Sequence, residues 1–112
     1  MRGHGVDIVE IKRLEGAVER WGDVFLKRVF TEREIAYSKK KHFPLQHLAA
    51  RFAAKEAVFK AFGTRPALNF KDIEIFNDEF GRPRCNVKNK LESILLSISH
   101  THEYAVASAI IP

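Results

Sequence analysis

Two carboxylates, Asp7 and Glu56, lie beside apolar residues, where a charged side chain is unexpected. Asp7 lies between Val6 and Ile8 in an alternating apolar segment, and Glu56 lies on the flank of an apolar helical stripe. Carboxylate oxygens are hard ligands of the kind Mg²⁺ prefers, and two of them leave positions for water and substrate phosphate. Two plainer interpretations stay open. Strand alternation could turn Asp7 toward water while its neighbours face inward, and Glu56 could form an ordinary surface pair with Lys60, one helical turn away.

Positively charged side chains accompany Glu56 on its predicted helix. Arg51, Lys55 and Lys60 could neutralise a polyanionic substrate. Lys55 falls inside the apolar stripe of Phe52 and Phe59, so the alternative is that its side chain reaches out of that face toward water.

A third polar group, Ser99-His100-Thr101, falls between two predicted strands. Its hydroxyls and imidazole could hydrogen-bond to phosphate oxygens, and the alternative is a polar turn.

Other catalytic, metal-binding and nucleotide-binding motifs are missing from the sequence. Cys85 has no motif around it, Ser99 beside His100 does not make a catalytic triad, and the histidines lack zinc-ligand spacing with cysteine. Neither a phosphate-binding loop nor a dinucleotide fingerprint occurs.

Composition narrows the class of protein. The chain has 112 residues and a formal net charge of +5, which favours an anionic partner or serves solubility alone. Cys85 is the only cysteine, so no intramolecular disulfide can form, which indicates a reducing compartment. No apolar run approaches the roughly 20 residues of a membrane span, and the first residues lack the apolar core of a signal peptide. We therefore expect a cytoplasmic protein without membrane contact.

Hydrophobic periodicity predicts the elements that position these groups. Residues 4–9 alternate as a strand, and helical spacing from residue 10 through Trp21 ends at Gly22. Thr31 and Glu34 form a capping-box pattern that starts a short helix. A longer helix is expected at 46–62, and strands are expected at residues 72–76, 84–87, 94–99 and 104–111. This order predicts a single α+β domain over residues 1–112, with an antiparallel sheet packed against helices.

Taken together, the motifs resemble a known family. The matching blocks are residues 5–11, 30–34, 51–64, 97–101 and 104–107, and the most specific is Arg51-Phe52-Ala53-Ala54-Lys55-Glu56-Ala57-Val58-Phe59-Lys60. In this order and at this length the chain resembles the holo-(acyl carrier protein) synthases, the short-chain branch of the phosphopantetheinyl transferases. The family often continues after Gly63-Thr64 with another glycine, whereas Arg65-Pro66 follows here.

The resemblance implies an activity, a fold and a set of site residues. It implies transfer of 4′-phosphopantetheine from coenzyme A to a serine of apo acyl carrier protein, for fatty acid biosynthesis, by a homotrimer of the phosphopantetheinyl transferase fold with active sites between subunits. Mg²⁺ would be held by Asp7 and Glu56. The catalytic residues would be Glu56, Lys60 and His100. Coenzyme A would contact Arg51, Lys60, Ser99, His100 and Thr101. The carrier protein would dock on Arg13 and Arg20, which lie seven residues apart and so share a helix face.

Several alternatives stay open. The serine proton could pass to Glu56 or to a metal-bound water, and the carrier could be a specialised one of the polyketide type. A basic, non-catalytic nucleic-acid-binding domain is the rival from another class. Such domains interleave exposed aromatic and basic residues on strands. Here the phenylalanines concentrate on helices at core spacing, so we expect no nucleic-acid partner.

Overall fold

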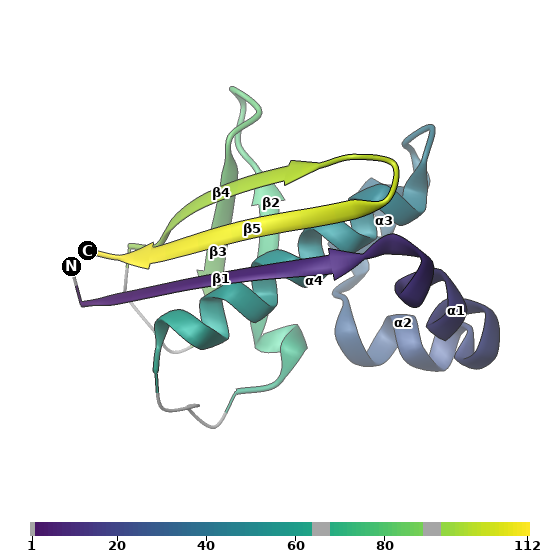
Figure 1. The fold of residues 1–112 in the computed structure, drawn as a ribbon, viewed down its shortest axis with the longest axis horizontal. Coiled ribbons are helices and arrows are strands. Elements are labelled where there is room, and N and C mark those ends of the chain that lie inside the picture. The colour runs from purple at the N-terminus through teal and green to yellow at the C-terminus, as the bar shows by residue number, and fades with distance from the viewer. Residues whose placement is uncertain (1, 64–67, 89–92) are drawn as a thin grey trace.

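The computed structural model describes residues 2–63, 68–88 and 93–112, which form an α+β fold (Figure 1). The elements are β1 (Gly3–Glu10), α1 (Ile11–Trp21), α2 (Asp23–Val29), α3 (Glu32–Lys39), α4 (Pro44–Ala61), a 3₁₀ turn (Phe70–Asp72), β2 (Ile73–Asn77), β3 (Pro83–Val87), β4 (Leu95–His100) and β5 (Tyr104–Ile111). Among these residues, no helix is both long and apolar enough to cross a lipid bilayer. The Arg65-Pro66 departure lies outside the described residues.

Most of the predicted elements are confirmed. Thr31 and Glu34 form both hydrogen bonds of the capping box at the start of α3. Gly22 has a φ of 57°, a left-handed conformation that suits glycine at the end of α1. Two elements were missed, α2 and the 3₁₀ turn, because both are short and neither carries a long periodic pattern.

The first strand of the chain pairs with the last. β5 is the central strand of a three-stranded antiparallel sheet with the order β1-β5-β4. Asp7 of β1 and Ile98 of β4 both lie opposite Ala107 of β5. Helix α4 packs against one face of this sheet and supplies the centre of the core through fully buried small residues, among them Ala53, Ala54 and Ala57 (Figure 1).

Strands β2 and β3 form a separate two-stranded sheet, which corrects the expectation of a single sheet. The hairpin itself was predicted, including Pro83 as the first residue of its return strand. Ile73 and Ile75 are buried, and β2 contacts α3 and α4. The alternating pattern shows which side of a strand is apolar, but not whether that side packs on a helix beside another sheet.

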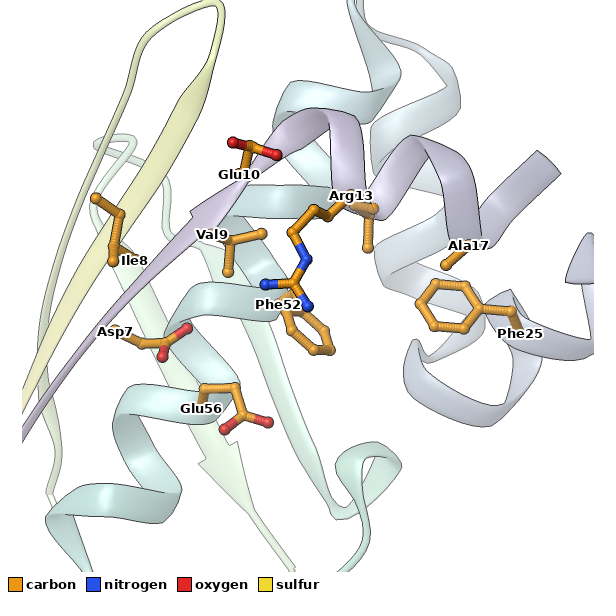
Figure 2. Close-up of a pocket in the computed structure, with 10 residues that line it drawn as sticks. Asp7, Ile8, Val9, Glu10, Arg13, Ala17, Phe25, Phe52 and Glu56 are labelled. Atoms are coloured by element: carbon orange, nitrogen blue, oxygen red, sulfur yellow. The ribbon is translucent and has the colours of Figure 1, made fainter. Parts of the chain in front are cut away.

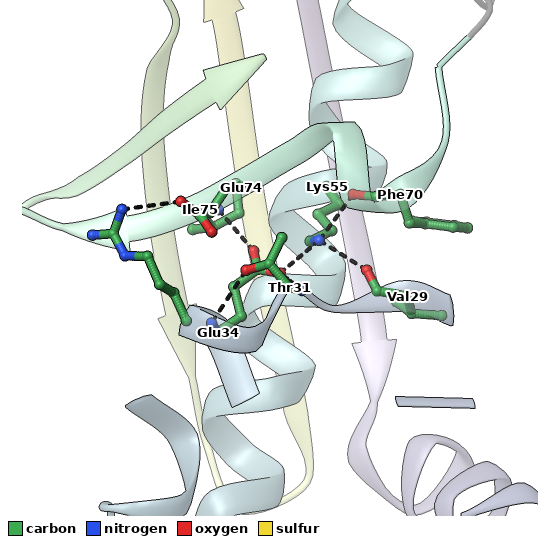
Figure 3. A network of polar contacts seen from close by, with 8 residues as sticks. Val29, Thr31, Glu34, Lys55, Phe70, Glu74 and Ile75 are labelled. Carbon is green, nitrogen blue, oxygen red and sulfur yellow. Dashed lines mark hydrogen bonds and ion pairs between the residues drawn. The ribbon is translucent and has the colours of Figure 1, made fainter. Parts of the chain in front are cut away.

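A buried ion pair anchors α4 to its surroundings (Figure 3). Lys55 Nζ lies 2.7 Å from Glu34 Oε1, and both side chains are 0% exposed. The same ammonium donates to the carbonyl oxygens of Val29 and Phe70 at 2.8 and 2.9 Å. All three N–H donors of Lys55 therefore have acceptors, which a buried charge requires.

These contacts correct both interpretations of Lys55. It neither reaches toward water nor offers charge to a substrate, because its charge is neutralised inside the protein. Glu34 also stabilises two other elements, since it caps α3 through Thr31 and accepts the Ile75 amide of β2 at 2.7 Å. Burial lowers the pKa of Lys55, and the Glu34 carboxylate opposes that effect.

Candidate functional site

Two glycines allow β1 to lie unusually close to α4. A Cβ atom on Gly3 would overlap the carbonyl oxygen of Ala61, and one on Gly5 would overlap that of Ala57. Gly3, Gly5 and Asp7 alternate on one side of β1, the side that faces the helix. The missing side chains therefore bring Asp7 close to α4.

Asp7 consequently lies on the opposite face from the one that the plain interpretation assigned. Val6 and Ile8 are the residues that face outward, with 50% and 65% of their surface exposed. The Asp7 side chain is only 17% exposed. Alternation alone could not indicate which of the two faces is the inner one, because both contain apolar or small residues.

Asp7 and Glu56 line one pocket of about 320 Å³ between β1, α1 and α4. Their carboxylates point into the same space, and the Arg13 guanidinium points toward it from α1 (Figure 2). Phe25 of α2 and Phe52 of α4 add an apolar wall. The packing of β1 against α4 thus brings together two carboxylates that are far apart in the sequence.

Lys60 completes this group. Its Nζ donates to Asp7 Oδ1 at 3.2 Å and to the Val6 carbonyl oxygen at 3.0 Å. The Lys60 side chain is 54% exposed, so its charge remains accessible from solvent. Lys60 therefore contacts β1, which the plain interpretation of a Glu56–Lys60 surface pair did not include.

The donor set at this pocket suits a magnesium ion that is shared with a substrate. Across the described residues, no group of three or more His, Cys, Asp or Glu side chains forms a metal-binding cluster. Two carboxylates from separate elements are nevertheless the usual protein share of an Mg²⁺ site, because this ion retains waters and takes phosphate oxygens as further ligands. Asp7 and Glu56 fit that pattern.

Arg51 lies elsewhere on α4. It is 4% exposed, its guanidinium carbon lies 4.0 Å from the centre of the Tyr37 ring, and its Nη2 donates to Asn77 Oδ1 at 2.8 Å. It lines a pocket of about 270 Å³ with Arg33 and Lys40. Within one chain, Arg51 therefore does not join the Asp7 pocket.

The Ser99-His100-Thr101 group also lies apart from that pocket. Ser99 and His100 end β4 and Thr101 follows it, and β5 separates β4 from β1. The plain interpretation as a polar turn is correct for Thr101, whose hydroxyl accepts the amides of Glu103 and Tyr104 at 3.1 and 3.0 Å. Ser99 faces outward from the sheet, opposite Val106. His100 is exposed, and its ring centre lies 5.7 Å from that of His47.

Arg13 and Arg20 share one face of α1, as their spacing predicted. Both line a groove of about 260 Å³ together with Trp21. Trp21 is 60% exposed, although its spacing had placed it with the apolar residues of the helix. Val24 of α2 is also exposed, and it lines a neighbouring pocket with Trp21 and Arg28.

Sequence reasoning missed the two glycines, the apolar wall and His47. Glycine at alternate positions of an otherwise β-branched strand was the available signal for a close backbone approach. Nothing in the spacing of Phe25 or His47 indicates which distant residues they meet.

Comparison with known proteins identifies the family. Residues 3–109 match the model of the 4′-phosphopantetheinyl transferase superfamily. The chain is 47% identical over 114 residues to the holo-[acyl-carrier-protein] synthase of Chloroherpeton thalassium, covering 96% of this chain and 94% of that protein.

Solved structures agree. The crystal structure of holo-[acyl-carrier-protein] synthase from Neisseria meningitidis superposes with a TM-score of 0.91 at 32% identity, covering 100% of this chain and 98% of that one. The synthase from Bacillus anthracis, in complex with CoA (3′,5′-ADP), gives a TM-score of 0.85 at 37% identity, covering 98% of this chain and 95% of that one. The chain belongs to the 4′-phosphopantetheinyl transferase superfamily, among the holo-[acyl-carrier-protein] synthases.

Proposed function

We propose that this protein transfers 4′-phosphopantetheine from coenzyme A to a serine of apo acyl carrier protein, in the cytoplasm and for fatty acid biosynthesis. The observation that carries the proposal is the placement of Asp7 and Glu56 on one pocket, with Lys60 bonded to Asp7, in a chain that matches holo-[acyl-carrier-protein] synthases over nearly its full length. The Bacillus anthracis relative, whose structure contains CoA (3′,5′-ADP), supports coenzyme A as the donor.

The reaction needs charge stabilisation more than covalent chemistry. The serine Oγ would form a bond to the β-phosphorus while the bond from that phosphorus to the bridging oxygen breaks, and adenosine 3′,5′-bisphosphate would leave with the electron pair. We assign the serine proton to Glu56. Lys60, held beside Asp7, would place its positive charge against the diphosphate.

Asp7 and Glu56 would hold Mg²⁺ in this proposal. The ion, when bound, would supply positive charge to the diphosphate oxygens as the leaving group separates. Before substrate binds, the ammonium of Lys60 would stabilise the carboxylate pair by offsetting part of its negative charge.

A homotrimer would complete the site. The outer face of the three-stranded sheet exposes large apolar residues, and a contiguous apolar surface of this kind marks a protein interface. The exposed side chains are Val6, Ile8, Leu95, Tyr104 and Val106. In this proposal a neighbouring subunit would bring its Ser99, His100, Thr101 and Arg51 toward the Asp7 pocket, where they would contact coenzyme A. Replacing Ile8 by Glu should yield monomers in sedimentation analysis, whereas a trimeric, fully active Ile8→Glu protein would contradict this assembly.

The carrier protein would dock on α1. Arg13 and Arg20 offer positive charge and Trp21 offers an aromatic surface, a combination that suits an acidic partner helix with apolar residues between its carboxylates. Because Arg13 also lines the Asp7 pocket, a carrier held there would bring its serine toward Glu56. Rates measured with a fatty-acid carrier and with a polyketide-type carrier would decide which one is physiological.

Carboxylate variants test the proposal. Asp7→Asn and Glu56→Gln should each lower the rate of carrier modification by about 10²-fold or more, since each removes a preorganised charge. Glu10 is a third carboxylate on the same pocket, so Glu10→Gln is the matched control and should lose little. Equal losses in all three variants, or none in the first two, would refute the assignment.

A further inference from the structure

A second polar cluster surrounds His47, on the side of α4 away from Asp7. His47 is half-buried, and its ring centre lies 5.9 Å from that of Tyr37 and 5.7 Å from that of His100. Tyr37 comes from α3 and His100 from the end of β4. His47, near the start of α4, therefore lies against the end of β4, where the predicted coenzyme A residues are.

Positive charge gathers around this cluster. The guanidinium of Arg51 and the ammonium of Lys41 both lie over the Tyr37 ring, at 4.0 and 4.6 Å from its centre. The Nε of Arg51 is buried and has no hydrogen-bond acceptor among the described residues. A buried, unsatisfied donor is costly, so the cluster contains donor capacity that the protein itself does not use.

Each element that packs around His47 contributes a charged or titratable group. These are Tyr37 from α3, Lys41 from the segment after it, His100 from β4 and Arg51 from α4 itself, and beside them Gln46 bonds to His102 of the next turn at 3.1 Å. Burial lowers the pKa of His47 below its usual value, and the positive charges of His100, Arg51 and Lys41 lower it further. Glu34 acts on Arg51, but its carboxylate is already engaged with Lys55.

A site with several cationic groups and little compensating negative charge favours an anion. A phosphate group has three terminal oxygens, so it can accept hydrogen bonds from more than one of these side chains. We propose that His47 is a further binding residue of the coenzyme A site, which takes up a proton when a phosphate group of coenzyme A binds beside His100. This inference rests on the proposed function, because it takes coenzyme A as the substrate.

The inference predicts that the affinity for coenzyme A decreases as pH rises. A bound phosphate favours the charged form of the imidazole, so the pKa of His47 is higher in the complex than in the free protein. The extra affinity is complete below the lower of these two pKa values and is lost as pH rises through the higher one. Between them, affinity falls by up to about tenfold for each pH unit if one proton is taken up.

Calorimetric titration with coenzyme A tests this directly. Binding is measured in two buffers of different ionisation enthalpy, between about pH 5 and 8, which gives the number of protons taken up. The native protein is compared with His47→Phe, which retains an aromatic ring against Tyr37, and with His47→Gln, which retains hydrogen-bonding capacity without titrating. His42→Phe is the matched control, because His42 is exposed and its ring contacts Phe43.

We expect both His47 variants to take up about one proton fewer than the native protein at the pH of maximal uptake, and to lose the steep part of the pH dependence. His42→Phe should retain both. The phosphate groups of coenzyme A also titrate; their intrinsic contribution is common to all four proteins, so the differences report the interacting pair of His47 and phosphate. Repeating the titration with 3′-dephospho-coenzyme A identifies the phosphate: loss of the His47-dependent uptake assigns it to the 3′-phosphate, and retention assigns it to the diphosphate.

Other outcomes are decisive against the inference. Proton uptake in His47→Phe and His47→Gln equal to that of the native protein would overturn it, while leaving the transfer reaction untouched. Absence of coenzyme A binding by the native protein would overturn both this inference and the proposed function.

Discussion

The glycine contact between β1 and α4 is the feature on which the position of Asp7 depends. A methyl group at Gly5 would lie 2.7 Å from the Ala61 amide nitrogen and 2.8 Å from the Lys60 Cβ, besides overlapping the Ala57 carbonyl oxygen. Ordinary carbon contacts begin near about 3.5 Å, so β1 would have to retreat by roughly 1 Å. Backbone atoms form most of this contact, so no rotamer change can relieve it.

Two effects should follow from Gly5→Ala. Overpacking should lower the free energy of unfolding by about 1–3 kcal/mol. A displacement of about 1 Å at Asp7, relative to Glu56 and Lys60, should lower kcat by about 10²-fold, because catalytic groups tolerate little misplacement. Denaturant unfolding measures the first effect, and the steady-state rate with saturating coenzyme A and carrier measures the second.

Two comparisons make this prediction sharp. Gly16→Ala adds the same methyl group where no atom lies within 4 Å, so it should not lower the unfolding free energy. In an Asp7→Asn background, Gly5→Ala should cost little further activity, because both changes act through the same carboxylate. A folded Gly5→Ala protein with native kcat, or fully additive losses in the double variant, would refute this explanation.

Three further predictions concern stability, docking and reactivity. Lys55→Met should lower the unfolding free energy by about 3–5 kcal/mol in a denaturant titration, because it leaves the Glu34 charge buried without its partner; a loss below about 1 kcal/mol would contradict the structural role of the pair. Arg20→Glu should raise the KM for carrier protein roughly fivefold or more and leave the KM for coenzyme A unchanged. Arg20 is preferred to Arg13 for this test because Arg13 also lines the Asp7 pocket. Equal changes in the two KM values would argue against carrier docking at Arg20. Burial raises the pKa of Cys85 to about 12, so its thiol stays protonated at neutral pH and should react with iodoacetamide only after unfolding; rapid alkylation of the folded protein would disprove this.

Local patterns in the sequence predicted local structure well. The capping box at Thr31, the glycine end of α1 and the hairpin with Pro83 at the start of a strand each depend on a few adjacent residues. Such features follow from backbone geometry that the residue types themselves impose. The motif resemblance added the family, which the comparisons confirm.

Features that join distant segments could not be predicted in the same way. Helix α4 defines the inner face of β1, although α1, α2 and α3 lie between these two elements in the sequence. Lys55 looked like a surface cation inside an apolar stripe, and only the fold brings Glu34 against it. No sequence pattern pointed to His47, because its role depends on ring contacts with Tyr37 and His100, which belong to other elements.

Transfer of phosphopantetheine at the Asp7 pocket can be followed by intact-protein mass spectrometry of the carrier. Apo acyl carrier protein is incubated with the native protein, coenzyme A and Mg²⁺, in parallel with an EDTA control and with Asp7→Asn. We expect a gain of one phosphopantetheine group per carrier, matched by an equal amount of released adenosine 3′,5′-bisphosphate, and a strongly reduced gain in both parallel reactions. An unmodified carrier, or a gain that neither EDTA nor Asp7→Asn diminishes, would contradict the proposed function.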